Sequence, residues 1–222
     1  MINIAIDGPA GAGKSSLSRL LANELEYIYV DTGALYRAVG LKFSRLGFDT
    51  ELKGDIEAVL GDTSVDIRFI DGAQRVFLDG VDVSDDIRTP IASMMASAVS
   101  AKPAVRAFLL DMQRNLAKKN NVVMDGRDIG TVVLPDAKVK IFLTADVETR
   151  AERRRKELVE KGQNVSFQEV LEDMKVRDHN DSHRPIAPLK QADDAVLADT
   201  TDLTFEQSLE LLIKIVKDGT KD

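Results

Sequence analysis

The sequence predicts an α/β fold in which helices cover both faces of a parallel sheet. Two observations lead to this prediction. Short apolar runs, typical of buried strands, alternate along the chain with longer segments in which apolar residues recur at helical spacing. Between about residues 47 and 90, strand and turn signals interrupt this alternation and predict an inserted lobe with a small antiparallel hairpin.

A glycine-rich segment joins the first predicted strand, an alternating run through Ile2, Ile4 and Ile6, to the first predicted helix. This segment, residues 8–16 (GPAGAGKSS), fits the phosphate-loop pattern of Gly, four residues, Gly, Lys and Ser or Thr. A strand that delivers such a loop to a helix N-terminus points unpaired N–H groups and the positive end of the helix dipole at an anion. The alternative, a glycine-rich turn without a ligand, is disfavoured by the Lys-Ser pair. We therefore predict a nucleoside triphosphate site.

Every residue of this loop is a candidate for binding the triphosphate: Gly8, Pro9, Ala10, Gly11, Ala12, Gly13, Lys14, Ser15 and Ser16. Lys14 is expected to reach the outer phosphates, and Ser15 to offer its hydroxyl to Mg²⁺. A carboxylate is expected to support the metal ion through a water molecule. Asp125 and Asp31, which both follow predicted strands, remain alternative candidates for this role.

The other core elements follow from the same two periodicities. Apolar runs predict strands at residues 27–30, 122–124, 139–143 and 195–198. Helical spacing predicts helices at residues 36–41, 91–101, 103–118, 146–160, 166–177 and 205–216. Pro103 suits the first turn of one helix, and Gly162 suits the end of another.

Inside the inserted lobe, residues 56–60 suggest a short helix and residues 65–69 alternate as a half-buried strand. Residues 76–78 return after a turn at Asp71-Gly72, and Asp79-Gly80 marks the next turn. A lobe inserted after the second strand is well placed to hold a second substrate.

The composition is that of an ordinary globular protein, with 44% hydrophobic and 30% charged residues in 222. Without cysteine, the chain has no disulfide, no thiolate zinc site and no cysteine nucleophile. No apolar run approaches the roughly twenty residues that cross a bilayer, and no signal-peptide pattern is present, so we expect a cytoplasmic protein without a membrane partner. The net charge of −7 argues against nucleic-acid binding.

A phosphate loop alone does not separate a kinase from a nucleotide-dependent switch. The Asn-Lys-x-Asp signature of guanine switches is absent, and arginines suited to phosphate groups occur in several segments: Arg37, Arg106, Arg127, Arg177 and Arg184. Each one alone is more often a surface residue or an ion-pair partner. Their distribution on both sides of the predicted triphosphate site favours a kinase with a phosphorylated acceptor.

Four segments together resemble the bacterial cytidylate kinases over nearly the whole chain. They are IAIDGPAGAGKSS at residues 4–16, VDTGALYRA at 30–38, MDGRDIGTVVLPDAKVKIFLTA at 124–145 and RDHNDSHRPIAPL at 177–189. The resemblance implies a five-stranded parallel core of the P-loop kinase type at residues 1–38, 102–147 and 164–222. It also implies a monophosphate-binding insertion at 39–101 and a mobile helical lid at 148–163.

The resemblance further implies Mg²⁺-dependent transfer of the ATP γ-phosphoryl group to CMP, and also to dCMP, by a monomeric enzyme of pyrimidine metabolism. The implied substrate-binding residues are Asp31, Thr32, Tyr36, Arg37, Ser97, Arg106, Arg127, Asp128, Arg177, Asp181 and Arg184. The implied catalytic residues are Lys14, Arg127, Arg150, Arg154 and Arg184. UMP, AMP or a non-nucleotide alcohol remains an alternative acceptor.

Asp128 is expected to select the base. Cytosine presents an exocyclic amine where uracil presents a carbonyl, and an ionised carboxylate accepts a hydrogen bond only from the amine. The alternative is that Asp128 caps the following turn or pairs with Arg127. Likewise, Arg177 and Asp181 are four residues apart and could form only a helical ion pair. The two histidines, His179 and His183, are interpreted as spacers.

Overall fold

The computed structural model describes residues 1–160 and 162–221. Contacts divide the chain into two compact units, Met1–Tyr29 with Asn120–Asp222 and Val30–Lys119. We call the first the phosphate-loop unit and the second the inserted unit. None of the helices that the described residues form combines the length and apolar character of a bilayer-spanning segment.

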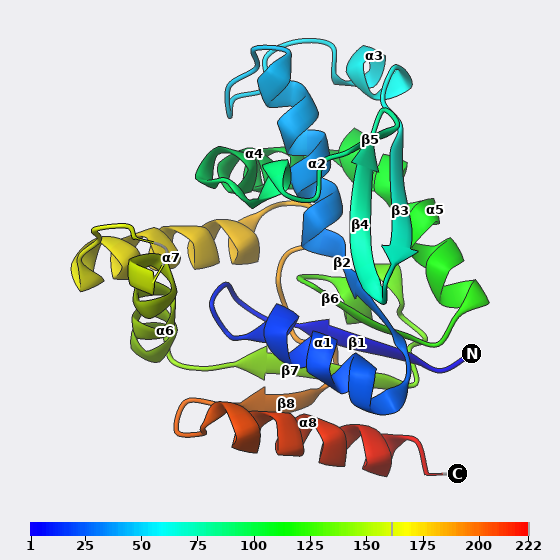
Figure 1. Ribbon diagram of the computed structural model, residues 1–222, viewed down its shortest axis with the longest axis vertical. Coiled ribbons are helices and arrows are strands. Elements are labelled where there is room, and N and C mark those ends of the chain that lie inside the picture. The colour runs from blue at the N-terminus through cyan, green and yellow to red at the C-terminus, as the bar shows by residue number, and fades with distance from the viewer. Residues whose placement is uncertain (161, 222) are drawn as a thin grey trace. The chain divides into compact units, whose positions relative to one another are not determined.

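Five strands form the predicted sheet: β1 (Asn3–Asp7), β2 (Ile28–Asp31), β6 (Val122–Gly126), β7 (Val139–Thr144) and β8 (Val196–Asp199). Their order is β2-β6-β1-β7-β8 (Figure 1). The central strand β1 pairs in parallel with both β6 and β7, and β7 pairs in parallel with β8. The carboxyl ends of β1 and β6 are therefore neighbours, with Asp7 opposite Gly126, and ligands of open parallel sheets bind beyond such ends.

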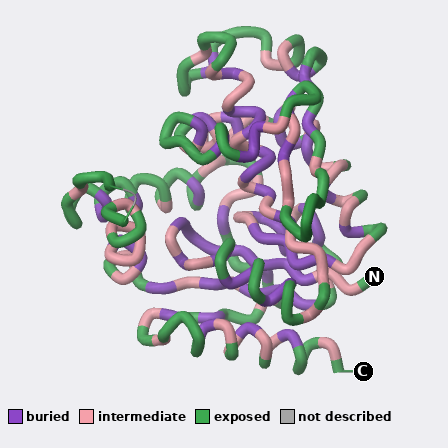
Figure 2. The backbone as a smooth tube through the Cα atoms, viewed as in Figure 1, coloured by how far each residue is buried: buried purple, intermediate pink, exposed green. Residues whose placement is uncertain are grey.

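Helices α1 (Lys14–Leu25) and α8 (Phe205–Gly219) pack on this sheet. Alternate residues of the strands, including Ile4 and Ile6 of β1, share one buried cluster with Leu21 of α1 and Leu212 of α8. Figure 2 shows the buried strands at the centre of this unit. The period of two in the strands and the apolar stripe of each helix account for this packing, and the α/β prediction is confirmed.

Helices α6 (Val147–Glu160) and α7 (Phe167–His183) pack against each other beside the sheet (Figure 1). Their shared apolar cluster is small: Ala151, Val170, Leu171 and Met174. A capping box between Ser166 and Glu169 begins α7, which runs six residues beyond the predicted end at Arg177. No Gly or Pro interrupts the chain until Pro185, so the helix continues. Residue 161 of the predicted lid and residue 222 of the predicted core lie outside the described residues.

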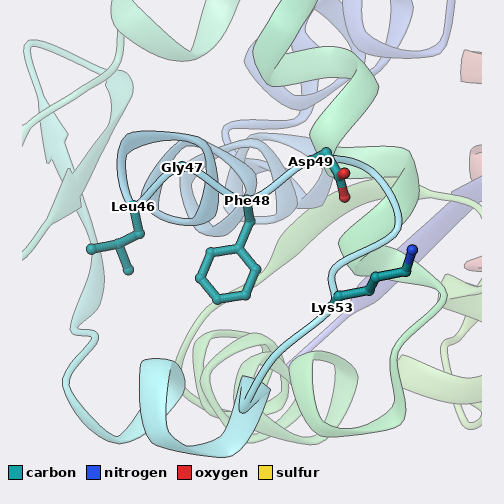
Figure 3. Close-up of a pocket in the computed structure, with 5 residues that line it drawn as sticks. All are labelled: Leu46, Gly47, Phe48, Asp49 and Lys53. Atoms are coloured by element: carbon teal, nitrogen blue, oxygen red, sulfur yellow. The ribbon is translucent and has the colours of Figure 1, made fainter.

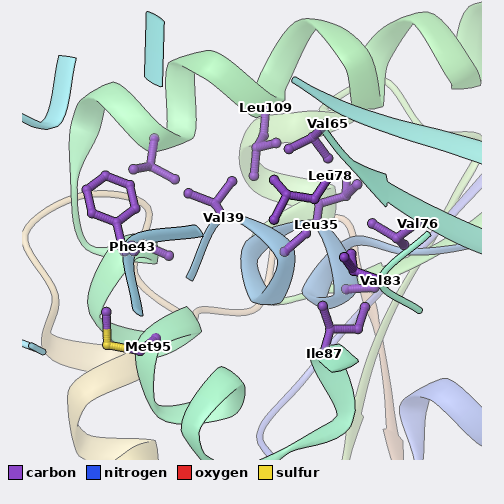
Figure 4. Packing of buried hydrophobic residues seen from close by; sticks show 14 of the residues in the cluster. Leu35, Val39, Phe43, Val65, Val76, Leu78, Val83, Ile87, Met95 and Leu109 are labelled. Carbon is purple, nitrogen blue, oxygen red and sulfur yellow. The ribbon is translucent and has the colours of Figure 1, made fainter. Parts of the chain in front are cut away.

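The inserted unit contains helices α2 (Thr32–Arg45), α3 (Ile56–Gly61), α4 (Pro90–Ser100) and α5 (Pro103–Lys119), and the 3₁₀ turn η1 (Asp86–Arg88). The predicted hairpin is present as β3 (Val65–Ile70) and β4 (Ala73–Leu78). A third strand, β5 (Val81–Asp82), pairs with β4 and was missed because it is only two residues long. Figure 4 shows the core of this unit, where Leu35 and Phe43 of α2 meet Met95 of α4 and Leu109 of α5.

The contact units and the functional division implied by the family divide the chain at different residues. Helices α2 and α5 share the apolar core of α4 and the hairpin, so contacts group residues 30–38 and 102–119 with the insertion. The functional division assigns both segments to the core. It remains a prediction about which segments move together.

Candidate functional site

The phosphate loop joins β1 to α1 in a backbone conformation that requires glycine. The φ angles of Gly8, Gly11 and Gly13 are +152°, +73° and +85°. A Cβ atom on Gly8 would lie 1.9 Å from the backbone oxygen of Leu143 in β7. Gly13 precedes α1 as its N-cap, and within the described residues no side chain caps this helix. The loop therefore presents the N-terminal N–H groups of α1 without a competing side chain.

Lys14 is buried in this loop, where its Nζ donates to the backbone oxygen of Pro9 at 2.7 Å. Burial lowers the pKa of Lys14 well below its ordinary value, and the positive charges of Arg127 and Arg177 lower it further. Asp125 and Asp181 act in the opposite direction without restoring the pKa. A bound polyphosphate would relieve this accumulation of positive charge.

Ser15, on the first turn of α1, donates through its hydroxyl to Asp125 Oδ2 at 3.0 Å. The other oxygen, Oδ1, accepts from the Tyr29 hydroxyl at 2.9 Å. Asp125 lies in β6, so the sheet places a buried carboxylate beside the loop. A serine hydroxyl and a carboxylate are the hard oxygen donors that Mg²⁺ prefers, so these residues fit that ion.

Asp31, the other candidate for this carboxylate, has different partners. Its Oδ1 accepts from the backbone N–H of Ala34 at 3.0 Å, so it caps the N-terminus of α2. Its Oδ2 accepts from Arg37 at 2.8 Å. The geometry therefore favours Asp125 over Asp31 as the carboxylate beside Ser15.

Two charge pairs connect the segment after β6 to the last turns of α7. Arg127 Nε donates to Asp181 Oδ2 at 2.7 Å, and Arg184 Nη2 donates to Asp128 Oδ1 at 3.4 Å. Asp181 pairs across 54 residues and is not merely half of a helical pair with Arg177. Burial raises the pKa of Asp181, but Arg127 and the neighbouring Arg177 and Arg184 outweigh burial and leave that pKa below its ordinary value. The folded chain thus gathers Arg127, Asp128, Asp181 and Arg184, four of the residues predicted for substrate binding.

These contacts bear on the alternatives for Asp128. Its side chain forms no capping hydrogen bond to the turn that follows it. Arg127 uses Asp181 as its ion-pair partner, and Arg184 contacts Asp128. Asp128 is 4% exposed, a burial that suits a carboxylate meant to discriminate between bases.

In the inserted unit, the predicted substrate residues lie on α2, α4 and α5. The guanidinium of Arg106 lies over the ring of Tyr36, 5.6 Å from its centroid, and donates to the backbone oxygen of Ser100 at 3.2 Å. Thr32 is buried at the start of α2, and Ser97 lies on α4 one turn before Ser100. A buried arginine beside an aromatic ring is suited to an anionic ligand.

Two arginines of the predicted lid, Arg150 and Arg154, are expected to be catalytic, and they differ in their surroundings. Arg150 is buried at the base of α6 and donates to the backbone oxygens of Ala145 at 2.8 Å and Ala10 at 2.9 Å. It also pairs with Asp178 of α7 at 2.7 Å. Arg154 is partly exposed further along α6 and pairs with Glu157. Arg150 therefore joins the phosphate loop to α6, which carries the predicted lid, and to α7, whereas Arg154 is accessible.

Three residues of this region were not singled out from the sequence: Asp7, Tyr29 and Asp178. Asp7 carried a detectable signal, because an acidic residue directly before a phosphate loop stands at the ligand-bearing end of a strand. Tyr29 and Asp178 act through contacts with Asp125 and Arg150, which lie far from them in sequence. No periodicity could have found these contacts.

A small surface pocket follows α2 in the inserted unit (Figure 3). It is lined by Leu46, Gly47, Phe48, Asp49 and Lys53. The ring of Phe48 packs edge-on against Phe43 at a centroid distance of 5.1 Å. The pocket contains none of the residues predicted to bind a nucleotide, so we assign it no role.

Comparisons with known proteins agree with these features. Residues 4–218 match the family model described as cytidylate kinase. A relative named Cytidylate kinase from Caldicellulosiruptor bescii is 52% identical over 220 residues, which cover 97% of each chain. Another of that name, from Caldanaerobacter subterraneus subsp. tengcongensis, is 50% identical over 99% of this chain and 96% of its own. An uncharacterized protein of known structure from Eubacterium ventriosum shares the fold, with a TM-score of 0.55 and 14% identity over 98% of each chain.

Proposed function

This chain belongs to the cytidylate kinase family, and on that premise we propose that it transfers the γ-phosphoryl group of ATP to CMP and to dCMP. Family membership makes it a nucleoside-monophosphate kinase, a phosphotransferase that uses a nucleotide donor. ATP as the donor, Mg²⁺ as the metal ion and dCMP as a second acceptor belong to the proposal.

One observation carries the proposal beyond the family name. Positive charge gathers beside the phosphate loop, where the buried Lys14 has Arg127 and Arg177 close enough to lower its pKa together with burial. The repulsion between these positive charges is unfavourable in the empty site. The phosphate groups of two bound nucleotides would offset it. The Arg127–Asp181 and Arg184–Asp128 pairs hold the guanidinium groups in place before a ligand arrives.

The proposed donor site consists of residues 8–16, with Lys14 on the outer phosphates. The proposed Mg²⁺ ligand is Ser15, supported by Asp125 through water. When bound, Mg²⁺ neutralises phosphate charge and fixes the geometry of the phosphates. The proposed acceptor site includes Thr32, Arg37 and Arg106 of the inserted unit.

In the proposed reaction, a phosphate oxygen of CMP attacks the γ-phosphorus of ATP. The bond from that phosphorus to the β–γ bridging oxygen breaks, which gives CDP and ADP. The second pKa of a phosphate monoester is about 6, so the attacking group is largely dianionic at neutral pH and needs no strong general base. Lys14 and the arginines contribute by positioning two anions and offsetting their repulsion. The exposed position of His179 and His183, whose rings stack on each other at 4.1 Å, agrees with a site without a histidine base.

The proposal is tested by a coupled assay of ADP release with CMP, dCMP, UMP, AMP and GMP as acceptors. We expect CMP and dCMP to stimulate ADP formation strongly and the other three acceptors to do so weakly. Equal stimulation by UMP would replace the cytosine preference with a general pyrimidine preference. No stimulation by CMP over ATP alone would overturn the proposed function.

A monomeric state and a cytoplasmic location are also part of the proposal. Light scattering of the purified protein tests the first, and fractionation of cells that produce it tests the second. A stable dimer in solution would correct the proposed monomer.

A further inference from the structure

Asp7 is the last residue of β1 and directly precedes the phosphate loop. Its Oδ1 accepts from the backbone N–H of Ile129 and its Oδ2 from the backbone N–H of Gly130, each at 2.7 Å. The carboxylate is 5% exposed, so these bonds are shielded from water. A single buried side chain thus connects the start of the donor loop to the segment that follows Asp128.

The segment that Asp7 holds has an unusual backbone. Residues Ile129–Val133 form a π-helical turn, η2, in which the N–H of Val133 donates to the oxygen of Asp128 and the N–H of Leu134 to that of Ile129. Wide turns of this kind are rare and occur often at functional sites. The Asp7 carboxylate occupies the two N–H groups with which this turn begins. It therefore fixes the direction in which the chain leaves Arg127 and Asp128.

The groups around Asp7 leave little room for another partner. A Cβ atom on Gly130 would lie 3.3 Å from Asp7 Oδ2 and 3.1 Å from Cδ of Lys140. The ammonium of Lys140 is engaged with Asp194 at 2.7 Å, so it does not neutralise Asp7. Asp128 and Lys14 are the other charged groups that act on Asp7. The two backbone N–H groups are thus its principal stabilising partners.

We propose that Asp7 is a positioning residue that aligns the two proposed acceptor-binding residues, Arg127 and Asp128, with the phosphate loop. The loop begins at Gly8 and the turn begins at Ile129, so one carboxylate sets the relative placement of donor and acceptor phosphates. This inference rests on the proposed function. In this role Asp7 acts through the backbone N–H groups of Ile129 and Gly130.

The variant Asp7→Asn tests this role, because it keeps the shape of the side chain but can accept only one of the two bonds. Its amide NH₂ would face the second backbone N–H. We expect the KM for CMP to rise about tenfold, which corresponds to about 1.4 kcal/mol. The Kd of a non-hydrolysable ATP analogue, measured without CMP, should change less than twofold. Deuterium uptake of peptides covering residues 126–134 should increase.

Gly130→Ala provides a second route should the Asn variant fail to fold. It keeps the carboxylate but crowds it, and the same selective rise in the KM for CMP is expected, to a smaller extent. Asp199→Asn is the matched control. Asp199 accepts from the backbone N–H of Thr201 at 2.9 Å in an exposed turn, and its loss should leave both nucleotide affinities unchanged.

The two proposals fail in different ways. Wild-type protein without CMP-dependent ADP formation would overturn the proposed function. If the wild type is active but Asp7→Asn keeps the wild-type KM for CMP, only the positioning role of Asp7 is overturned. Gly130→Ala replaces Asp7→Asn in this test if Asp7→Asn does not fold. An equal loss of binding affinity for CMP and for the ATP analogue would also overturn the positioning role, because that result indicates general loosening of the phosphate-loop unit.

Discussion

The charged residues of the site are held by one another before any ligand binds. Arg127 pairs with Asp181, Arg184 contacts Asp128, and Lys14 donates to its own loop. Each of these groups has given up hydration on burial, and its partner compensates for only part of that loss. Removing one partner of a pair leaves the other charge buried without compensation, so such a substitution should affect stability as well as ligand binding.

We predict that Lys14→Ala lowers turnover about 100- to 1,000-fold, since it removes a buried cation aimed at developing phosphate charge. The free energy of unfolding should change by less than about 1 kcal/mol, because burial already disfavours this charge. Steady-state kinetics and urea unfolding measure the two effects. Lys42→Ala, which removes a lysine that pairs with Asp79 in the inserted unit, is the control that should keep its turnover. A Lys14→Ala enzyme with near-normal turnover would remove this residue from the mechanism.

Asp128→Asn should narrow the preference for CMP over UMP. An ionised carboxylate accepts from the cytosine amine and repels the uracil carbonyl, whereas an asparagine amide can donate to that carbonyl. We expect the ratio of kcat/KM values to fall by about tenfold, within the range of about 1 to 3 kcal/mol for one base contact. Parallel assays with both acceptors give this ratio. An unchanged ratio would assign base selection to another residue.

Asp7 should give the protein a specific dependence of stability on pH. Burial raises the pKa of Asp7 from 3.8 to about 6, despite the hydrogen bonds from Gly130 and Ile129 that lower it. The folded state thus holds this proton more tightly than the unfolded state, and the free energy of unfolding falls as pH rises from about 4 to about 6. At about 1.4 kcal/mol per pKa unit, the free energy of unfolding lost through Asp7 reaches about 3 kcal/mol at the top of this window and does not change at higher pH.

The measurement is urea unfolding at several pH values between 4 and 8, for wild type and Asp7→Asn side by side. Other carboxylates, such as Asp181, shift in the opposite direction and cancel in the difference between the two proteins. We expect the wild type to lose stability relative to the variant over this window. Parallel profiles would show that Asp7 keeps an ordinary pKa in the folded protein.

The phosphate loop depends on its neighbours in the sheet as much as on its own glycines. β1 delivers the loop between β6 and β7, and the backbone of β7 passes so close to Gly8 that no side chain fits. The turn η2 follows β6 and is tied to the last residue of β1. The phosphate-loop motif is recognisable in the sequence, but its geometry in the folded chain depends on β1, β7 and η2.

Gly8→Ala should destabilise the protein by more than about 4 kcal/mol, because its Cβ would meet the Leu143 backbone oxygen at 1.9 Å. Gly80→Ala is the matched control. Gly80 also has a positive φ, +81°, but no atom within 4 Å of the added Cβ, so only the backbone cost of about 1 to 2 kcal/mol is expected. Thermal or urea unfolding distinguishes them. Similar losses in both variants would mean that β7 moves aside for the added methyl group.

At the scale of the molecule, contacts divide the chain into two compact units, and the predicted lid begins at a buried anchor in the first of them. Arg150 attaches the start of α6 to the phosphate loop and to α7, and the rest of the α6–α7 pair has only a small apolar core of its own. A helix that packs on its neighbour through so small an apolar core is suited to movement about an anchored end. Movement that excludes water from the reacting phosphates is the expected role of the predicted lid.

We predict that bound nucleotides protect the lid from trypsin at residues 153–156. Limited proteolysis with and without CMP and a non-hydrolysable ATP analogue, quantified by mass spectrometry, measures the cleavage rate there. Cleavage at the exposed Lys217 of α8 serves as the reference, and its rate should not change. Equal cleavage of the lid in both conditions would argue against closure.

Local patterns in the sequence were sufficient for much of the molecule. The alternation of Ile4 and Ile6, the GPAGAGKSS motif and the turn residues Asp71-Gly72 depend on neighbours within a few positions, so strands, phosphate loop and hairpin were predictable. The missed features have long-range causes. The π-helical turn after Asp128 is held by a residue more than 100 positions away, and β5 is too short to show a period.

The sequence by itself determined the α/β class, the phosphate loop and the set of arginines, because each is written in residue type and spacing along the chain. Only the tertiary structure decided which charges meet: Arg127 with Asp181, Ser15 with Asp125, and Asp7 with the backbone after Asp128. The physical reason is that electrostatic and hydrogen-bond partners are selected by distance in space. In a parallel sheet, the ends of β1 and β6 are neighbours in space although more than 100 residues separate them along the chain.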